Sequence, residues 1–319
     1  VIFKNMLLSD KKVFPVNPKA DKILGHRAYE DLLEIPHNID CIIIAVPAKI
    51  VPLILRQAGK RNAKCAIIIS AGFSETGNNE LEERILKIAN EEKITLLGPN
   101  SYGIIDPFQK LNTTYYEGIP KTCKIAFISQ SGAIGSAILD KINKLSGFVS
   151  IGDSAQIDFT EFIEYYSNDK NTQIITLYIE SLKEGKGKRF IEVCKKCKKP
   201  IIALKAGKSQ AGQRAAQSHT AALASEKGVY SGILKQAGVI EVDSIKQLFT
   251  VAKILEKYGP FSKGLRPRGQ KLGNKAGIIT NAGGLGVLTT DACEENKIKV
   301  HSLSKTTIEK LNKFLPESW

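Results

Sequence analysis

The sequence predicts an α/β fold in which parallel strands alternate with helices that cover both faces of the sheets. Short apolar runs recur along the chain, and in several of them apolar residues occupy consecutive positions, as in Cys41–Val46. Consecutive apolar residues are typical of strands that are buried on both faces. Amphipathic stretches of helical length lie between these runs, and this alternation of strands and helices indicates parallel sheets.

The predicted elements follow from these two patterns in chain order. The apolar runs predict strands at Cys41–Val46, Ala66–Ser70, Ile94–Leu97, Lys124–Ser129, Ile174–Ile179, Pro200–Leu204, Gly238–Val242 and Ala276–Thr280. Apolar residues at helical spacing predict helices at Asn78–Glu91, Ile134–Leu145, Glu226–Gln236 and Ser244–Lys257.

Length and composition set the class of protein. The chain has 319 residues, a net charge of +14 and 43% hydrophobic residues, which is enough apolar material for two or more domains. Its apolar runs are far shorter than the roughly 18 residues that span a bilayer, and no secretory signal precedes its six cysteines. We therefore expect a soluble, cytoplasmic protein with no membrane partner.

Charge and cysteine patterns exclude two further kinds of site. Lysine and arginine cluster at residues 183–199 and 263–275, but aromatic residues, 7% of the chain, do not interleave with them, so we do not expect a nucleic-acid partner. Cys194 and Cys197 have the spacing of a metal pair, but no second pair accompanies them. No metal site is predicted in this chain.

Two shifts in composition predict the domain boundaries. Gly118 and Pro120 precede a new strand, and residues 259–274 are rich in glycine, proline and basic residues. We expect domains at 1–118 and 119–258, a linker at 259–274 and the start of a further domain at 275–319. The last has room for only about two strands. Because the chain also begins at Val1, we expect it to be part of a longer protein.

Two glycine-rich turns are candidates for binding an anion. Ser129–Ser136 joins a predicted strand to a helix, so backbone N–H groups and hydroxyls converge at a helix N-terminus. Alternatively, Ser131 only caps the helix and Gly132 only relieves the turn. No lysine follows the glycine, which disfavours a nucleoside triphosphate. The turn Thr280–Val287 repeats this geometry, and its glycines allow either close packing of the strand against the helix or contact with a phosphate.

One histidine and one carboxylate stand in settings that suit chemistry. His219 lies in a polar segment of small residues, where a neutral imidazole would be accessible to attack phosphorus. An ordinary surface histidine is the alternative. Glu180 follows the apolar run Ile174–Ile179, at the strand end where parallel sheets place ligand-handling groups, although a solvated strand-end charge is also consistent with this position.

Taken together, several segments resemble the α subunit, or α-like part, of the nucleoside-diphosphate-forming acyl-CoA ligases. The resemblance is closest to ADP-forming acetyl-CoA synthetase and more distant to succinyl-CoA synthetase, and it covers essentially the whole chain. The segments that carry it are Val16–Lys19, Val46–Ala48, Ser70–Glu75, Gly98–Gly103, Ser129–Gly132, Tyr178–Glu180, Ser218–Thr220 and Thr280–Gly284.

The resemblance implies a Rossmann-like CoA-binding domain followed by flavodoxin-like parallel α/β domains. It implies that His219 becomes phosphorylated, that Glu180 orients it, and that the turn with Ser129, Ser131 and Gly132 receives the phosphoryl group. The residues that it assigns to CoA binding are Asn17, Lys19, Pro47, Ser70, Ala71, Gly72 and Asn100.

The resemblance also implies the reaction and the partners. Acyl-CoA, ADP and phosphate would give a carboxylic acid, ATP and CoA through an acyl phosphate and a phosphohistidine. Since the chain shows no ATP-grasp domain, ADP or ATP and Mg²⁺ would bind mainly to a β subunit or a fused β domain, in a hetero-oligomer.

Three departures from the family pattern qualify this expectation. The family's first glycine-rich turn would lie before Val1. Ala221 stands where the family pattern usually has glycine, and Ser225 departs from the pattern in a similar way, so the loop that carries His219 would be stiffer. Asp153 replaces the usual asparagine, which adds a negative charge. The alternative function is an acyl-CoA-sensing module, like those fused to some protein acyltransferases, that has the same fold but no phosphotransfer.

Overall fold

The computed structural model describes residues 1–183, 185–207, 227–259, 275–280 and 283–314. The chain divides into two units, Val1–Phe261 and Ser262–Trp319. The parallel α/β class predicted from the sequence is confirmed in the first unit, which holds one parallel sheet and one mainly parallel sheet.

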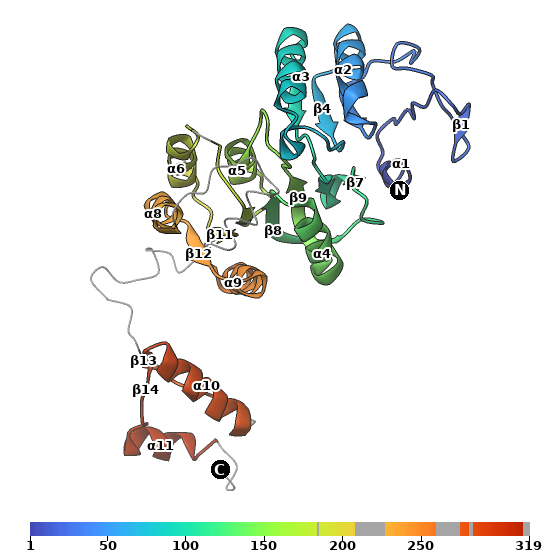
Figure 1. Cartoon of the computed structure of the whole chain (residues 1–319). Helices are drawn as coiled ribbons and strands as arrows, with labels where there is room; N and C mark the ends of the chain where they lie inside the picture. The colour runs from blue at the N-terminus through green and yellow to red at the C-terminus, as the bar shows by residue number, and fades with distance from the viewer. Residues whose placement is uncertain (184, 208–226, 260–274, 281–282, 315–319) are drawn as a thin grey trace. The chain divides into compact units, whose positions relative to one another are not determined.

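The smaller sheet contains three parallel strands in the order β3 (Cys41–Ile44), β4 (Cys65–Ile68) and β5 (Thr95–Leu97). Helices α2 (Val51–Lys60) and α3 (Asn79–Glu92) pack side by side over it (Figure 1). Their apolar side chains and those of the strands form one core, in which Leu55 and Ile85 are fully buried. The short 3₁₀ helices here are η1 (Ala48–Ile50) and η2 (Ser74–Thr76).

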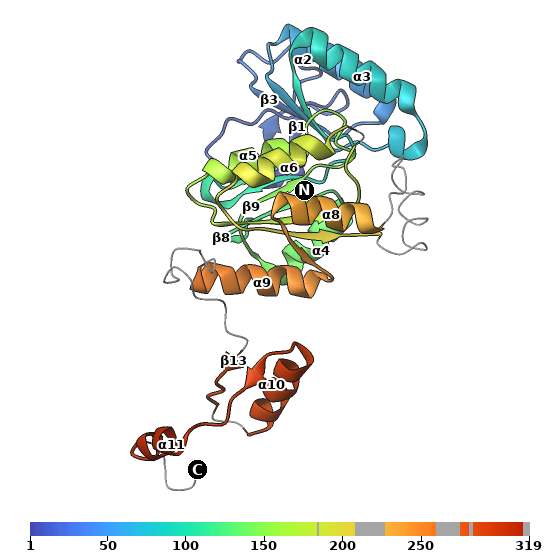
Figure 2. The same cartoon turned by 90° about the vertical axis from the view of Figure 1, so that its left-hand side faces the viewer.

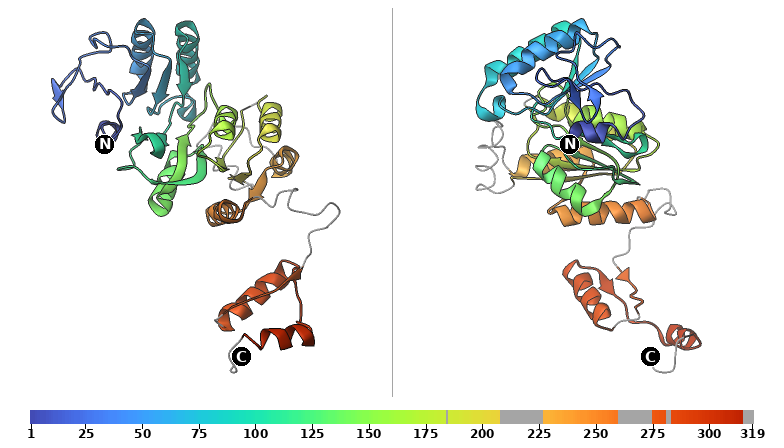
Figure 3. Two further views of the ribbon diagram at one scale, coloured as in Figure 1. Left: turned by 180° about the vertical axis from the view of Figure 1, so that it is seen from behind. Right: turned by 90° about the vertical axis from the view of Figure 1, so that its right-hand side faces the viewer.

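The chain before this sheet contains one short helix and a small hairpin. Helix α1 (Ile2–Met6) precedes the strands β1 (Lys22–Ile23) and β2 (His26–Arg27). Asn5 donates from Nδ2 to the carbonyl of Thr114 at 2.9 Å and accepts from the N–H of Gly118. These bonds fix α1 beside the segment that leads into the larger sheet, as Figure 3 shows.

The larger sheet has seven strands in the order β12-β11-β10-β8-β9-β6-β7. Five strands are parallel, while β6 pairs antiparallel with both β9 and β7. The strands are β6 (Gly103–Asp106), β7 (Leu111–Asn112), β8 (Lys121–Ser129), β9 (Lys144–Ser150), β10 (Ile174–Ile179), β11 (Ile201–Lys205) and β12 (Ile240–Val242). The 3₁₀ helix η3 (Pro107–Gln109) joins β6 to β7.

Helices cover both faces of the larger sheet, as consecutive apolar residues predict (Figure 2). One face packs against α5 (Phe159–Asn168), α6 (Gly187–Lys196) and α8 (Lys227–Ala237), and the other against α4 (Gly132–Ile142) and α9 (Ile245–Tyr258). Phe159 and Phe190 lie in the first core, and Phe127 and Phe249 in the second.

The helix predicted at 134–145 is wrong at its end. Asn143 adopts a left-handed conformation (φ 44°) that ends α4, and Leu145 lies instead in β9, a strand absent from the predicted elements. β9 is buried between β8 and β6, and this position depends on pairing with distant strands. The strands β6 and β7, before the expected boundary at residue 118, also pair in the larger sheet.

The second unit contains two short parallel strands, β13 (Lys275–Ala276) and β14 (Lys299–Val300), with helices α10 (Gly283–Glu295) and α11 (Lys305–Leu311). The predicted strand at 276–280 is therefore observed only at its beginning. Within the described ranges, no helix is long and apolar enough to cross a membrane.

Candidate active site

The order of the parallel strands locates the candidate site. Taken along the chain, the strands from β8 to β12 have the spatial order 2-1-3-4-5, so the chain leaves the adjacent strands β8 and β10 toward opposite edges of the sheet. Sheets of this order bind ligands at that switch point, outside the carboxyl ends of the two strands. Ser129 of β8 and Tyr178 of β10 are paired there, so the switch point lies beside two of the predicted segments.

The turn after β8 forms the N-terminus of helix α4. Ser131 is the N-cap, and its Oγ accepts a hydrogen bond from the N–H of Ile134 at 3.3 Å. The Ser129 hydroxyl is buried and donates to the carbonyl of Ser131 at 2.7 Å. Ser131 therefore has the capping role considered above, while the positive end of the helix dipole at this turn still suits an anion.

Gly132 allows a close approach at the same turn. A Cβ atom added to it would lie 3.0 Å from the Cβ of Tyr102, on the segment that precedes β6. The hydroxyl of Tyr102 donates to Ser136 Oγ on α4 at 3.2 Å. Tyr102 therefore packs against the first turns of the helix and helps to fix its N-terminus.

The structure brings Glu180 next to this turn. The side chain of Gln130, between Ser129 and Ser131, accepts hydrogen bonds from the backbone N–H groups of Glu180 and Ser181, each at 2.9 Å. Burial first, and the nearby Glu180 carboxylate second, raise the pKa of Tyr178 to about 12. Gln130 was not among the predicted site residues. His219 lies outside the described residues.

The residues expected to bind CoA lie mostly at the carboxyl edge of the smaller sheet. The Ser70 hydroxyl bonds both backbone groups of Val46, which precedes Pro47. The N–H of Asn100 donates to the carbonyl of Ser70 at 2.9 Å. These bonds gather the turns after β3, β4 and β5 at one edge, where parallel sheets bind ligands.

The backbone conformation of the turn that contains Ala71 and Gly72 requires a glycine at residue 72. Gly72 has a φ of +110°, and a Cβ atom on it would lie 3.2 Å from the Cβ of Ala48. Its N–H and that of Phe73 donate to the carboxylate of Glu75. The turn is therefore held by its own carboxylate, while Ala71 remains exposed.

Asn17 and Lys19 lie in the segment before the hairpin β1–β2. Asn17 Oδ1 accepts from the N–H of Lys19 at 2.9 Å, and Lys19 is exposed. The neighbouring Val16 packs against the same core as Val46 and Ala48. Within the described part of the chain, however, no hydrogen bond joins Asn17 or Lys19 to the turns of Ser70 or Asn100.

Asp153 lies where the edges of the two sheets meet. Its N–H donates to the carbonyl of Pro99, and Asn100 Nδ2 donates to its Oδ1 at 3.3 Å. Its Oδ2 is buried and has no hydrogen-bond donor among the described residues. Burial first, and a hydrogen bond and repulsion with the Glu75 carboxyl second, raise the pKa of Asp153 to about 8. The negative charge expected at Asp153 is therefore largely neutralised at neutral pH.

Gly152 makes the contact between the two sheets closer still. It has a φ of +57°, and a Cβ atom on it would lie 2.2 Å from the carbonyl oxygen of Pro99. A side chain at this position would push the loop after β9 away from the turn after β5.

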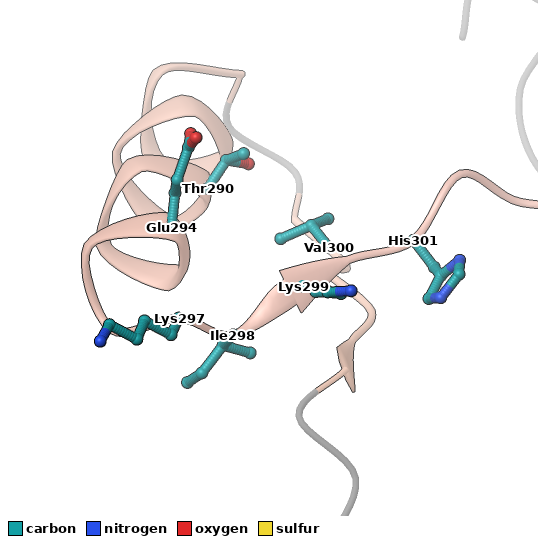
Figure 4. A pocket seen from close by; sticks show the side chains of 7 residues that line it. All are labelled: Thr290, Glu294, Lys297, Ile298, Lys299, Val300 and His301. Carbon is teal, nitrogen blue, oxygen red and sulfur yellow. The ribbon is translucent and has the colours of Figure 1, made fainter.

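A separate hollow of about 580 Å³ lies in the second unit, lined by side chains of α10, β14 and the residues that join them (Figure 4). Glu294 and Thr290 project from the helix, while His301 follows the strand. None of the predicted site residues lies there. Of the predicted turn at 280–287, the described residues show that α10 begins at Gly283.

Comparison with known proteins adds two matches to families. Residues 1–107 match a family described as a CoA binding domain, and residues 122–255 match one described as a succinyl-CoA ligase like flavodoxin domain. The residues between the two matches, 108–121, contain β7 and the segment that leads into β8.

Individual relatives match over nearly the whole chain. The α subunit of acetate–CoA ligase (ADP-forming) II from Pyrococcus furiosus is 40% identical, and the match covers 99% of this chain and 68% of that one. An acetate–CoA ligase (ADP-forming) from Methanocaldococcus jannaschii is 42% identical over 99% of this chain, which spans only 44% of that relative's length.

A solved structure agrees with these relatives. The dinucleotide-forming acetyl-coenzyme A synthetase 1 of Ca. Korarchaeum cryptofilum, in complex with phosphate and ADP, superposes with a TM-score of 0.88 at 33% identity. The match covers 99% of this chain and 68% of that chain.

Proposed function

Because the chain belongs to the family of ADP-forming acetate–CoA ligases, as the part that corresponds to the α subunit, we propose that it carries the CoA-binding and phosphoryl-carrying half of such an enzyme. The reaction is acyl-CoA + ADP + phosphate ⇌ carboxylic acid + ATP + CoA. The observation that supports it best is the meeting of the Ser129–Gly132 turn with Glu180 at the switch point of the larger sheet.

The proposed chemistry begins with an acyl phosphate. Inorganic phosphate attacks the carbonyl carbon of the thioester, and the C–S bond breaks to release CoA. The free ring nitrogen of His219 then attacks phosphorus, and the carboxylate leaves as the acid product. Glu180 accepts a hydrogen bond from the other ring nitrogen and stabilises the imidazolium that forms. The N-terminus of α4 stabilises the phosphoryl oxygens. A terminal phosphate oxygen of ADP then attacks the phosphorus of phosphohistidine, and the P–N bond breaks to give ATP and free His219.

The proposed CoA site consists of Asn17, Lys19, Pro47, Ser70, Ala71, Gly72 and Asn100. The turns after β3, β4 and β5 suit a pyrophosphate-bearing ligand. Gly72 has no side chain, so the ligand can approach the backbone of its turn closely. Lys19 is exposed and supplies a cation for a phosphate. The loop of Gly152 and Asp153 connects this edge to the phosphoryl site.

The nucleotide requires a partner. The relative from P. furiosus is named as a subunit alpha, whereas this chain spans 44% of the relative from M. jannaschii. We propose that ADP and Mg²⁺ bind to an ATP-grasp β subunit or fused β domain in a hetero-oligomer. We also propose domains at 1–118, 119–258 and 275–319, and a cytoplasmic location, which suits the free thiols.

The test is ATP formation by the chain combined with its ATP-grasp partner. Acetyl-CoA, ADP, phosphate and Mg²⁺ are supplied, and ATP is measured together with CoA binding by calorimetry. We expect ATP formation by the wild type and none by His219→Ala, with CoA binding unchanged. CoA binding without any ATP from the wild type would reject the ligase and favour the sensing module.

A further inference from the structure

The segment that carries Glu180 is held by side chains at three successive amides. The N–H groups of Glu180 and Ser181 both donate to Gln130 Oε1, each at 2.9 Å, and the N–H of Leu182 donates to the hydroxyl of Tyr230 at 2.9 Å. The acceptors come from two different elements, the turn between β8 and α4 and helix α8. The three donors, by contrast, are consecutive in sequence.

Gln130 is built into the turn with every side-chain polar group bonded. It is 8% exposed, its Nε2 donates to Ser181 Oγ at 3.2 Å, and its backbone N–H donates to the carbonyl of Tyr178. A buried amide that is hydrogen-bonded at both its oxygen and its nitrogen is held in one orientation. Gln130 therefore fixes the backbone of Glu180 relative to the turn after β8.

Tyr230, which accepts from the next amide at Leu182, is also held in place. It is 7% exposed, and the ammonium of Lys205, at the end of β11, lies 4.4 Å from the centre of its ring. Lys205 is the strand partner of Ile179, which directly precedes Glu180. The phenol oxygen thus reaches Leu182 from a ring that is itself packed against the end of the sheet.

The backbone N–H groups that follow the neighbouring strands have a different kind of hydrogen-bond acceptor. After β9, the N–H of Ile151 donates to the carbonyl of Ser129, and after β11, the N–H of Ala206 donates to the carbonyl of Ile179. Those bonds are made by the backbone alone. At residues 180–182 the chain has left the sheet, so its amides depend on two side chains.

We propose that Gln130 and Tyr230 are positioning residues that hold Glu180 in register with the Ser129–Gly132 turn for phosphoryl transfer. This inference rests on the proposed function. A general base or orienting carboxylate acts only in a narrow range of positions, so a shift of its backbone slows the reaction even when the fold persists.

The test measures the initial rate at which labelled ATP and Mg²⁺, with the ATP-grasp partner, transfer phosphate to the chain. Gln130→Met keeps the shape of the side chain but removes the acceptor, and we expect it to slow labelling about 10- to 100-fold. Tyr230→Phe removes one hydroxyl, and we expect a loss of about 3- to 10-fold. Ser231→Ala removes a hydroxyl from the same helix as Tyr230, together with its hydrogen bond to Glu241, but no contact with residues 180–182. It is the matched control and should label at nearly the wild-type rate.

A double-mutant cycle separates positioning from a general structural effect. Gln130→Met is combined with Glu180→Gln, and the melting temperature of each variant is recorded. If Gln130 acts through Glu180, Gln130→Met slows labelling much less in the Glu180→Gln background than in the wild type. Independent, additive effects would overturn the proposal. If Gln130→Met does not fold, the same cycle is made with Tyr230→Phe.

The outcomes distinguish this inference from the proposed function. A wild type that takes no label overturns the proposed function and this inference with it. A wild type that is labelled, with Gln130→Met and Tyr230→Phe labelled equally fast, overturns only the positioning roles.

Discussion

At the scale of single residues, Asp153 shows how the structure changes the chemistry expected from a residue type. An aspartate between the two proposed ligand sites suggests a negative charge that opposes phosphate. Its Oδ2, however, is buried without a donor among the described residues, and its neighbours include the carboxyl groups of Glu75 and Glu82. Among the described residues, the ammonium of Lys183 lies 3.3 Å from the Glu82 carboxylate. A proton held by Asp153 relieves this repulsion.

This proton predicts a dependence of stability on pH. The unfolded chain releases the Asp153 proton near its ordinary pKa of 3.8, whereas the folded protein keeps it up to a pKa of about 8. Between these values the folded state binds more protons, so the contribution of Asp153 to the free energy of unfolding falls as pH rises. Asp153→Asn removes this contribution and supplies a permanent amide donor to Glu75.

We therefore expect the melting temperature of Asp153→Asn, relative to the wild type, to increase from about pH 5 to about pH 8. Differential scanning calorimetry at several pH values measures this difference, in which the other titrating groups cancel. A difference that stays constant or decreases with pH would show that Asp153 is ionised in the folded protein.

At the scale of elements, helix α4 serves both the fold and the site through its first turn. Ser131 caps α4 by accepting from Ile134, and Ser244 caps α9 by accepting from Gln247 at 3.2 Å. The two helices cover the same face of the sheet, but only α4 begins beside Glu180. Ser131 and Ser244 therefore have the same capping role, but only Ser131 lies beside the proposed site.

Removing either cap should cost about the same stability. We expect Ser131→Ala and Ser244→Ala each to lower the free energy of unfolding by about 1 kcal/mol in urea titrations. Only Ser131→Ala should also slow phosphorylation of the chain, because only that helix N-terminus faces the proposed phosphoryl site. Equal labelling rates for both variants would argue against an anion at α4.

The same scale shows what the sequence could predict. The strands β8, β10 and β11 follow from consecutive apolar residues, because burial on both faces leaves that signature. Strand β9 contains Lys144, Ser146 and Gly147 and follows α4 directly, so only its pairing with β8 and β6 reveals it. The strands β6 and β7 hold only two apolar residues and one, respectively, so no apolar run marks them and only their pairing reveals them.

The candidate site was predictable in part for a similar reason. The turn Ser129–Gly132 and Glu180 each carry a local pattern at a strand end. Gln130 lies about fifty residues along the chain from the amides whose hydrogen bonds it accepts. Tyr230 lies nearly as far from Leu182. Such contacts depend on strand order, which no local pattern reports.

At the scale of the whole molecule, the resemblance to acyl-CoA ligases is confirmed by relatives that match along the entire chain. The fold agrees, since the part that matches a CoA binding domain precedes the part that matches a flavodoxin domain like that of succinyl-CoA ligase. The loop 150–155 bonds to the turns at the carboxyl ends of both sheets. The central claim is that a phosphoryl group passes through His219.

The most direct measurement of that claim locates the phosphate. The full chain and its ATP-grasp partner are incubated with labelled ATP and Mg²⁺, quenched in acid or alkali, and the labelled peptide is identified by mass spectrometry. We predict a label that is stable in alkali, labile in acid, located on His219 and absent from His219→Ala. A label on another residue, or CoA binding with no label at all, would contradict the account.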